Sequence, residues 1–134
     1  MIVIDTSIAF KWFNTVEPGF EKAISLLEQH LQQKETILVP DLLIYELTNA
    51  WTTKTSLTYK EVSKNLLLLE RVKLKIQPVS FNLCRKASQL AKKYHLSVYD
   101  AIYAVIAKEN KCYLYTADAK FKSKTNLAFI RVIQ

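Results

Sequence analysis

The chain has 134 residues and a mass of 15.5 kDa, a length that suits one compact domain. Half of the residues are apolar and 23% are charged, which excludes a disordered chain. Glycine occurs once, at Gly19, which excludes a P-loop, a dinucleotide fingerprint and a kinase-type phosphate loop, since each needs several glycines. The same count, with only three prolines, disfavours a turn-rich sandwich or barrel.

Short apolar runs alternate with segments of helical periodicity along the whole chain. In chain order, we predict a strand at 1–4, helices at 6–13 and 20–33, a strand at 37–39, helices at 42–50 and 59–73, a strand at 76–79, helices at 81–94 and 98–110, a strand at 113–115, a short helix or loop at 117–124, and a strand at 128–132. This alternation predicts an α/β fold in one domain, 1–134, with a central parallel sheet of four to five short strands and helices on both faces.

Local signals agree with these boundaries. Thr58, with Glu61 three residues later, has the pattern of a capping box, and Ser80 can cap the helix that follows it. Pro78 interrupts the third strand, which therefore belongs near an edge of the sheet.

Positive charge is concentrated in the second half of the chain. Residues 1–75 hold nine Lys/Arg and nine Asp/Glu, whereas residues 76–134 hold ten Lys/Arg against three acids and so carry the whole net charge of +7. This imbalance favours a polyanionic partner, either nucleic acid or an anionic membrane, although a solvated lysine-rich surface has the same composition.

Two further features concern the compartment. Cys84 and Cys112 lack CxxC spacing, so we expect reduced, mostly buried thiols in a cytoplasmic protein. No signal peptide is expected at the N-terminus, and no apolar run is long enough to span a bilayer, so we expect no membrane partner.

Four acidic residues are candidates for a functional site, and two of them stand where an α/β fold places its sites. Asp5 follows the first predicted strand and Asp118 the fourth, and sites in parallel sheets form at the carboxyl ends of strands. Glu46 and Asp100 lie on apolar helices, where a carboxylate is costly unless it is paired or coordinated. Each acid also has a purely structural explanation: a helix cap for Asp5 or Asp100, a lysine partner for Glu46, and a turn for Asp118.

The segments around these acids carry a family resemblance. They read V-I-D-T-S at 3–7, E-L-T-N-A at 46–50, Y-D-A-I-Y at 99–103 and L-Y-T-A-D at 114–118. In this order and spacing they resemble the motifs of PIN-domain ribonucleases, in the small branch that includes VapC-type toxins of toxin–antitoxin pairs. The resemblance covers residues 1 to about 132 and implies a three-layer α/β/α fold. One departure precedes Asp100, where the family often has a glycine and this chain has Tyr-His-Leu-Ser at 94–97.

The resemblance implies a metal site made of Asp5, Glu46, Asp100 and Asp118, binding Mg²⁺ or Mn²⁺. Carboxylate oxygens suit these hard cations, and a metal-held water can attack a phosphodiester. We expect Asp5 and Asp100 to be direct ligands, Asp118 to be the next candidate, and Glu46 to act through water.

Further residues are assigned supporting roles around this site. The residues expected to orient the carboxylates or contact phosphate are Thr6, Ser7, Asn49 and Thr116. The lysines expected to bind the phosphates of RNA are Lys11, Lys120, Lys122 and Lys124. A helix cap explains Thr6 and Ser7 equally well, and a solvated loop explains the last three lysines.

The resulting hypothesis is a metal-dependent endoribonuclease, the toxin of a toxin–antitoxin pair, that leaves 5′-phosphate and 3′-hydroxyl ends and forms a homodimer. We place its antitoxin over the apolar surface near Trp12, Phe13 and Trp51. One alternative is an inactive PIN-fold module that only binds RNA or protein. Another is a different metal phosphoesterase, but the haloacid-dehalogenase type needs a second Asp where Ser7 stands.

Overall fold

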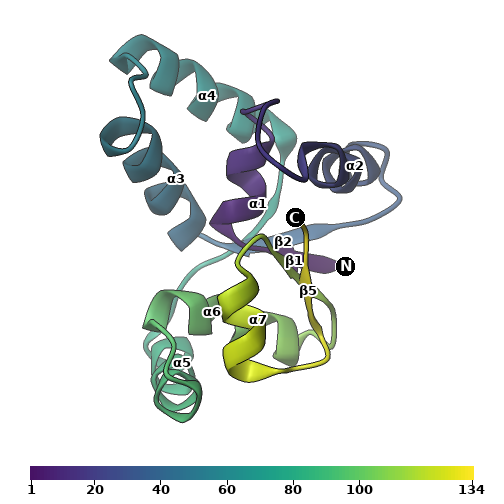
Figure 1. Cartoon of the computed structure of the whole chain (residues 1–134), viewed down its shortest axis with the longest axis vertical. Coiled ribbons are helices and arrows are strands. Elements are labelled where there is room, and N and C mark those ends of the chain that lie inside the picture. The colour runs from purple at the N-terminus through teal and green to yellow at the C-terminus, as the bar shows by residue number, and fades with distance from the viewer.

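Five short strands form one fully parallel sheet at the centre of the computed structural model, which describes residues 1–134 (Figure 1). The strands are β1 (Ile2–Ile4), β2 (Ile37–Pro40), β3 (Lys75–Gln77), β4 (Leu114–Thr116) and β5 (Ile130–Val132). Their order across the sheet is β3-β2-β1-β4-β5, and every neighbouring pair is parallel. The predicted parallel sheet is therefore confirmed, with β1 at its centre.

Seven helices cover the two faces of the sheet. They are α1 (Thr6–Lys11), α2 (Phe20–Leu31), α3 (Leu42–Thr53), α4 (Tyr59–Val72), α5 (Phe81–Tyr94), α6 (Val98–Glu109) and α7 (Ala119–Thr125). Helices α1 to α4 lie on one side of the sheet and α5 to α7 on the other (Figure 1). This is the predicted three-layer α/β/α arrangement.

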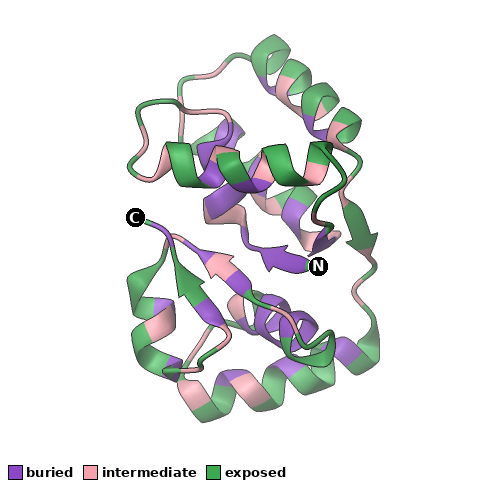
Figure 2. Ribbon diagram, turned by 90° about the vertical axis from the view of Figure 1, so that its right-hand side faces the viewer, coloured by how far each residue is buried: buried purple, intermediate pink, exposed green.

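The core lies between these layers, where the strands β1 and β2 and the inward faces of the helices are buried (Figure 2). All residues of β1 and β2 are buried, which explains why both strands read as continuous apolar runs rather than as alternating patterns. Helix α6 is buried without interruption over 101–107 and contacts β1, β2 and β4.

Both tryptophans belong to this core. Trp51 is 1% exposed and meets the edge of Phe13 at 4.9 Å between ring centroids. The buried indole of Trp12 donates a hydrogen bond to the Ala23 carbonyl at 2.8 Å. The prediction that these two side chains offer a surface to an antitoxin is therefore not supported.

The ends of the elements follow the local signals. The side chains of Thr58 and Ser80 accept hydrogen bonds from the first turns of α4 and α5, as predicted. Strand β3 lies at an edge of the sheet, also as predicted, but it ends at Gln77 rather than at residue 79. The reason is that Pro78 has no N–H, and that the N–H of Val79 donates instead to the Asp41 carboxylate at 3.1 Å.

The two histidines are more structural than the sequence indicated. His95 ends α5 with φ of 56° in the left-handed region, in the turn where the family often has glycine. His30 is half-buried and accepts a hydrogen bond from the N–H of Ile37 at 3.1 Å. The other nitrogen of its ring lies 3.0 Å from the Val72 carbonyl, so His30 joins α2 to β2 and to the end of α4.

The cysteines and the helix lengths bear on two further expectations. Cys84 and Cys112 are both free thiols, but Cys84 is exposed and Cys112 partly exposed, so the expectation of buried thiols was wrong. No helix in the structure has the length and apolar character needed to cross a bilayer.

The burial of Trp51 generates a test. Replacement by alanine should lower the free energy of unfolding by about 3–5 kcal/mol, because it leaves a large cavity beneath Phe13. Thr52→Ala, at the exposed neighbouring position, is the control and should change it by less than about 0.5 kcal/mol. Chemical denaturation of the two variants measures both values, and equal stability would contradict the core assignment.

Candidate active site

The four predicted acids lie at the ends of neighbouring elements. Asp5 follows β1 and is the N-cap of α1, while Asp118 follows β4 and is the N-cap of α7. Because β1 and β4 are parallel neighbours, these two residues leave the sheet at the same edge. Asp100 is in the first turn of α6 and Glu46 is in α3. The topology thus gathers residues that are up to 113 positions apart in the sequence.

Asp5 is the most deeply buried of the four, at 6% exposure. One of its oxygens, Oδ1, accepts hydrogen bonds from the N–H and the hydroxyl of Ser7 at 3.0 and 2.5 Å. The other, Oδ2, accepts from the Thr116 hydroxyl at 2.5 Å. Burial is the largest influence on this carboxyl and raises its pKa to about 6, and the charge of Asp100 acts in the same direction against the hydrogen bonds.

Ser7 and Thr116 thus hold the Asp5 carboxylate from two different elements. The Ser7 oxygen also accepts from the N–H of Ala117 at 2.8 Å, and the Thr116 oxygen accepts from the N–H of Asp118 at 3.0 Å. These bonds connect α1 directly to the segment that follows β4, so the position of Asp5 depends on both.

Glu46 is held by a second set of hydroxyls. Its Oε1 accepts from the Thr6 hydroxyl at 2.7 Å and from the Tyr103 hydroxyl at 2.6 Å. Burial and the negative charge of Glu46 both raise the pKa of Tyr103, so the phenol stays protonated and remains a donor. Thr6 therefore acts on Glu46, as an orienting residue would. Sequence reasoning assigned no role to Tyr103, although its place one turn after Asp100 on the same helix is a usable signal.

Asp100 is electrostatically central to the four carboxylates. Its pKa is raised first by burial and then by the charges of Asp118 and Glu46, and Asp100 in turn raises the pKa of Asp5. The Asp118 side chain is more exposed and caps α7 by accepting from the N–H groups of Lys120 and Phe121 at 2.9 and 3.3 Å. The cluster is therefore a set of mutually repelling acids.

The chemistry of these donors fits a hard divalent cation, but the side chains do not form a closed cage. No three or more acidic, histidine or cysteine side chains lie close enough together to hold one ion between them. Carboxylate oxygens from two or three positions nevertheless suit Mg²⁺ or Mn²⁺, because Mg²⁺ keeps several of its waters in protein sites. A bound cation would also offset the repulsion that raises the pKa values of Asp5 and Asp100.

Two of the predicted supporting residues do not join the cluster. Lys11 is buried, and its ammonium donates a hydrogen bond to the Pro18 carbonyl in the loop before α2, so the predicted contact with RNA is not supported. Asn49 is exposed on α3, and its side chain makes no hydrogen bond to any of the four acids. Its position one turn after Glu46 is the only link to the site.

The three lysines after Asp118 differ from one another. Lys120 is exposed, whereas the ammonium of Lys122 donates to the Leu127 carbonyl at the end of α7. Lys124 donates to the His95 carbonyl at 3.3 Å, and its charge lowers the pKa of Asp100. Lys124 is thus the lysine whose charge acts on the acidic cluster.

This fold and acidic cluster agree with a family assignment made from the sequence as a whole. The family model of the PIN domain matches residues 2–127. The chain belongs to the PIN domain family. Among curated proteins, no sequence matches it significantly.

Solved structures with the same fold support this assignment. A toxin–antitoxin complex from Klebsiella pneumoniae aligns with a TM-score of 0.72 at 16% identity, over 98% of this chain and 97% of that one. VapC20 from Mycobacterium tuberculosis, described as a toxin that cleaves the sarcin–ricin loop, aligns over 100% of both chains at 0.73 and 14% identity. VapBC2 from Rickettsia felis, bound to promoter DNA, aligns over 100% of both chains at 0.72 and 19% identity. At these identities the likeness concerns the fold.

The raised pKa of Asp5 predicts how the stability of this PIN domain changes with pH. The folded chain keeps the Asp5 proton up to about pH 6, whereas the unfolded chain releases it near the ordinary value of 3.8. In EDTA, Asp5 should therefore lower the stability progressively as the pH rises from about 4 to about 6, by up to about 3 kcal/mol.

Asp5→Asn should remove this loss, so that the free energy of unfolding of the variant rises relative to that of the wild type between pH 4 and pH 7. Urea denaturation at both pH values measures the difference. Glu28→Gln, at an exposed acid on α2, is the control and should follow the wild type. Parallel stability curves for wild type and Asp5→Asn would show that burial does not raise this pKa.

Proposed function

We propose that this PIN domain is a divalent-metal-dependent endoribonuclease and the toxin of a toxin–antitoxin pair. The observation that carries the proposal is the group of four coupled carboxylates at the carboxyl edge of the sheet, with Asp100 interacting with the other three. The proposal is also supported by fold similarity to VapC20, a toxin that cleaves the sarcin–ricin loop, and to a toxin–antitoxin complex.

Each residue has a defined task in this reaction. Asp5 and Asp100 would hold Mg²⁺ or Mn²⁺, with Asp118 and Glu46 contributing directly or through water. When bound, the metal supplies a water activated for attack on phosphorus and stabilises charge on the phosphoryl oxygens.

The neighbouring residues position this machinery. Ser7 and Thr116 fix the orientation of the Asp5 carboxylate, and Thr6 and Tyr103 fix that of Glu46. Of the predicted phosphate ligands, Lys120 is exposed and Lys124 acts on Asp100, and we assign the phosphates of RNA beside the scissile bond to these two. Lys122 is not assigned to them, because its ammonium donates to the Leu127 carbonyl.

A second candidate is a PIN-fold module that binds RNA without cutting it. The observation that favours it is that no three acids lie close enough together to hold one ion. A module that binds RNA without a metal needs no such group of acids. The two functions differ in their need for metal, which decides between them.

We place the antitoxin in the hollow between α1, α3 and α4 rather than on the tryptophan surfaces. This hollow has a volume of about 480 Å³. It is lined by Phe13 and Trp51, which were part of the antitoxin surface predicted from the sequence, and also by Phe10 and Leu68. Leu68 is 41% exposed, so an apolar side chain of a partner helix could cover it.

We also propose that two copies of the chain associate in the cytoplasm. Near the starts of α3, α5 and α6, Tyr45, Phe81 and Tyr99 are 69%, 87% and 59% exposed, and large exposed aromatic side chains are typical of interfaces. Light scattering of the wild type should give the mass of a dimer, and Phe81→Arg should lower it.

The nuclease activity is tested with purified protein and a mixed cellular RNA pool. Discrete cuts should occur with Mn²⁺ or Mg²⁺ and disappear with EDTA, because the acidic cluster needs the cation to activate water. Asp100→Asn should lower the rate by at least about a hundredfold, since it removes the central carboxylate of the cluster.

The matched control is Glu28→Gln, which removes one negative charge at an exposed position of α2. It should cut at the wild-type rate. Unchanged RNA in all samples, with RNA still bound equally by wild type and Asp100→Asn, would support the non-cutting module instead.

The antitoxin placement is tested by capture of partners from a lysate of the source cells. The wild-type chain should retain a small protein that Leu68→Glu loses, because a charge in the hollow opposes burial of an apolar partner. Leu31→Glu, which places the same charge at an exposed leucine of a different helix, α2, should still retain the small protein. Retention by both variants would place the antitoxin elsewhere.

A further inference from the structure

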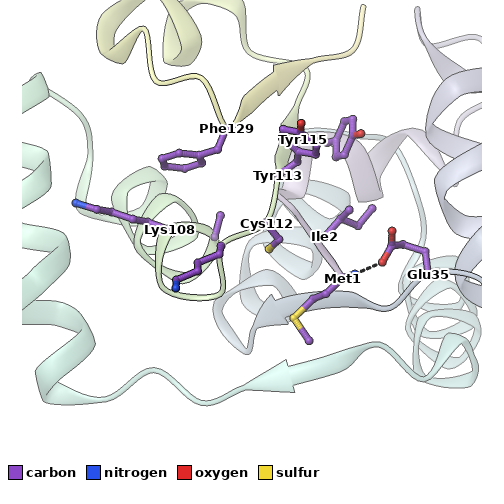
Figure 3. Close-up of a pocket in the computed structure, with 10 residues that line it drawn as sticks. Met1, Ile2, Glu35, Lys108, Cys112, Tyr113, Tyr115 and Phe129 are labelled. Carbon is purple, nitrogen blue, oxygen red and sulfur yellow. Dashed lines mark ion pairs between the residues drawn. The ribbon is translucent and has the colours of Figure 1, made fainter.

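Two hollows adjoin one another at the end of α6 that is remote from Asp100. The first, of about 750 Å³, lies between α5 and α6 and contains four lysines. The second, of about 650 Å³, lies beside the start of β4 and is mostly apolar (Figure 3). Lys108 and Lys111 line both, so the two hollows form one continuous surface.

The first hollow is strongly basic. Its lysines are Lys86, Lys93, Lys108 and Lys111, and its single acid, Glu109, pairs with Lys86 at 2.5 Å. The other three lysines form no salt bridge. A surface with three unpaired ammonium groups attracts a polyanion.

The second hollow has an aromatic wall. Tyr113, Tyr115 and Phe129 line it, with Tyr113 44% exposed (Figure 3). The guanidinium of Arg131 lies over the Tyr113 ring at 4.3 Å, which adds positive charge beside this wall. The only acid of the hollow, Glu35, forms an ion pair with the amino group of Met1. Both acids of the combined surface are therefore already neutralised.

This surface is separate from the acidic cluster. Lys108 follows Asp100 by eight residues on α6, which corresponds to about 12 Å along the helix axis. Lys111 lies beyond the end of the helix, farther from Asp100. A ligand on the lysines and the aromatic wall would therefore not occupy the proposed catalytic position.

We propose that these two hollows form a second nucleic-acid site, which binds an unpaired segment of RNA outside the cleavage position. The lysines hold its phosphates, and its bases stack on Phe129 and on the part of the Tyr113 ring that Arg131 leaves exposed. A phosphate group by itself would account for the lysines but not for the aromatic wall. Lysines with aromatic rings beside them match a nucleic-acid strand, which carries both phosphates and flat aromatic bases. The choice of RNA rests on the proposed function and deepens it, since it implies a substrate that reaches both ends of α6.

The test is binding of a labelled, unstructured RNA of twelve nucleotides to the Asp100→Asn variant, which prevents cutting, followed by fluorescence anisotropy. Adding Lys108→Gln and Lys111→Gln should raise the Kd about tenfold at low salt. The slope of the logarithm of the binding constant against the logarithm of the salt concentration should become about 1.4 less steep, the value for two phosphate contacts on a single strand. Adding Tyr113→Ala instead should raise the Kd about five- to tenfold for the single strand but not for a duplex of the same length, whose bases are paired.

The matched control pair is Lys22→Gln with Lys60→Gln, which removes the same charge from exposed positions of α2 and α4. It should change the Kd less than about twofold. If both pairs of substitutions weaken binding equally, the effect comes from net charge alone and the proposal is overturned. A Tyr113→Ala effect that is the same on the duplex would also overturn it.

Cleavage by the wild type separates this proposal from the nuclease. If RNA is cut but the Lys108 and Lys111 variants bind as tightly as their parent, the second site is wrong and the nuclease stands. If no RNA is cut but these variants still lose binding, the nuclease is wrong and the second site stands.

Discussion

The buried carboxylate of Asp5 connects three elements at the centre of this structure. It lies at the end of the central strand β1, and its two oxygens are divided between α1, through Ser7, and β4, through Thr116. Such charge-assisted hydrogen bonds keep a buried acid from being left without partners, which would cost several kcal/mol. The same bonds fix the edge of the sheet where the other three acids gather, so fold and candidate site share one interaction.

This arrangement stores electrostatic repulsion that a cation would relieve. Like charges on neighbouring carboxylates raise one another's pKa values. The pKa values of Asp5 and Asp100 are raised accordingly, with burial as the larger cause for both. Neutral hydroxyls, rather than lysines, surround Asp5 and Glu46, so no ammonium competes for these carboxylates. Positive charge lies at the rim with Lys124 and in a separate surface around Lys108, where phosphates rather than carboxylates would meet it.

The site was predictable where a residue's role follows from its place in a regular element. Asp5 and Asp118 stand at helix starts directly after strands, so the periodicity of the chain was sufficient to locate them, whereas Asp100 was assigned to the site through the resemblance to a family motif. Lys11 and the tryptophans were not predictable in the same way. Lys11 follows Asp5 by six residues, but its ammonium donates a hydrogen bond to the Pro18 carbonyl in the next loop. Tryptophans at these positions suit either a core or a protein interface, and only the contacts of Trp12 with Ala23 and of Trp51 with Phe13 place them in the core.

By itself, the sequence determined the order and type of the elements, the parallel sheet and the positions of Asp5 and Asp118 at its carboxyl edge. Those features depend on local periodicity, capping residues and the rule that parallel strands end together. Only the tertiary structure decided which hydroxyl meets which carboxylate, that Tyr103 supports Glu46, and that the acids repel one another without closing a three-ligand cage. It also decided that Lys108 and Tyr113, on opposite sides of a turn, face adjoining hollows. Side-chain contacts between distant segments depend on packing in three dimensions, which spacing along one chain does not encode.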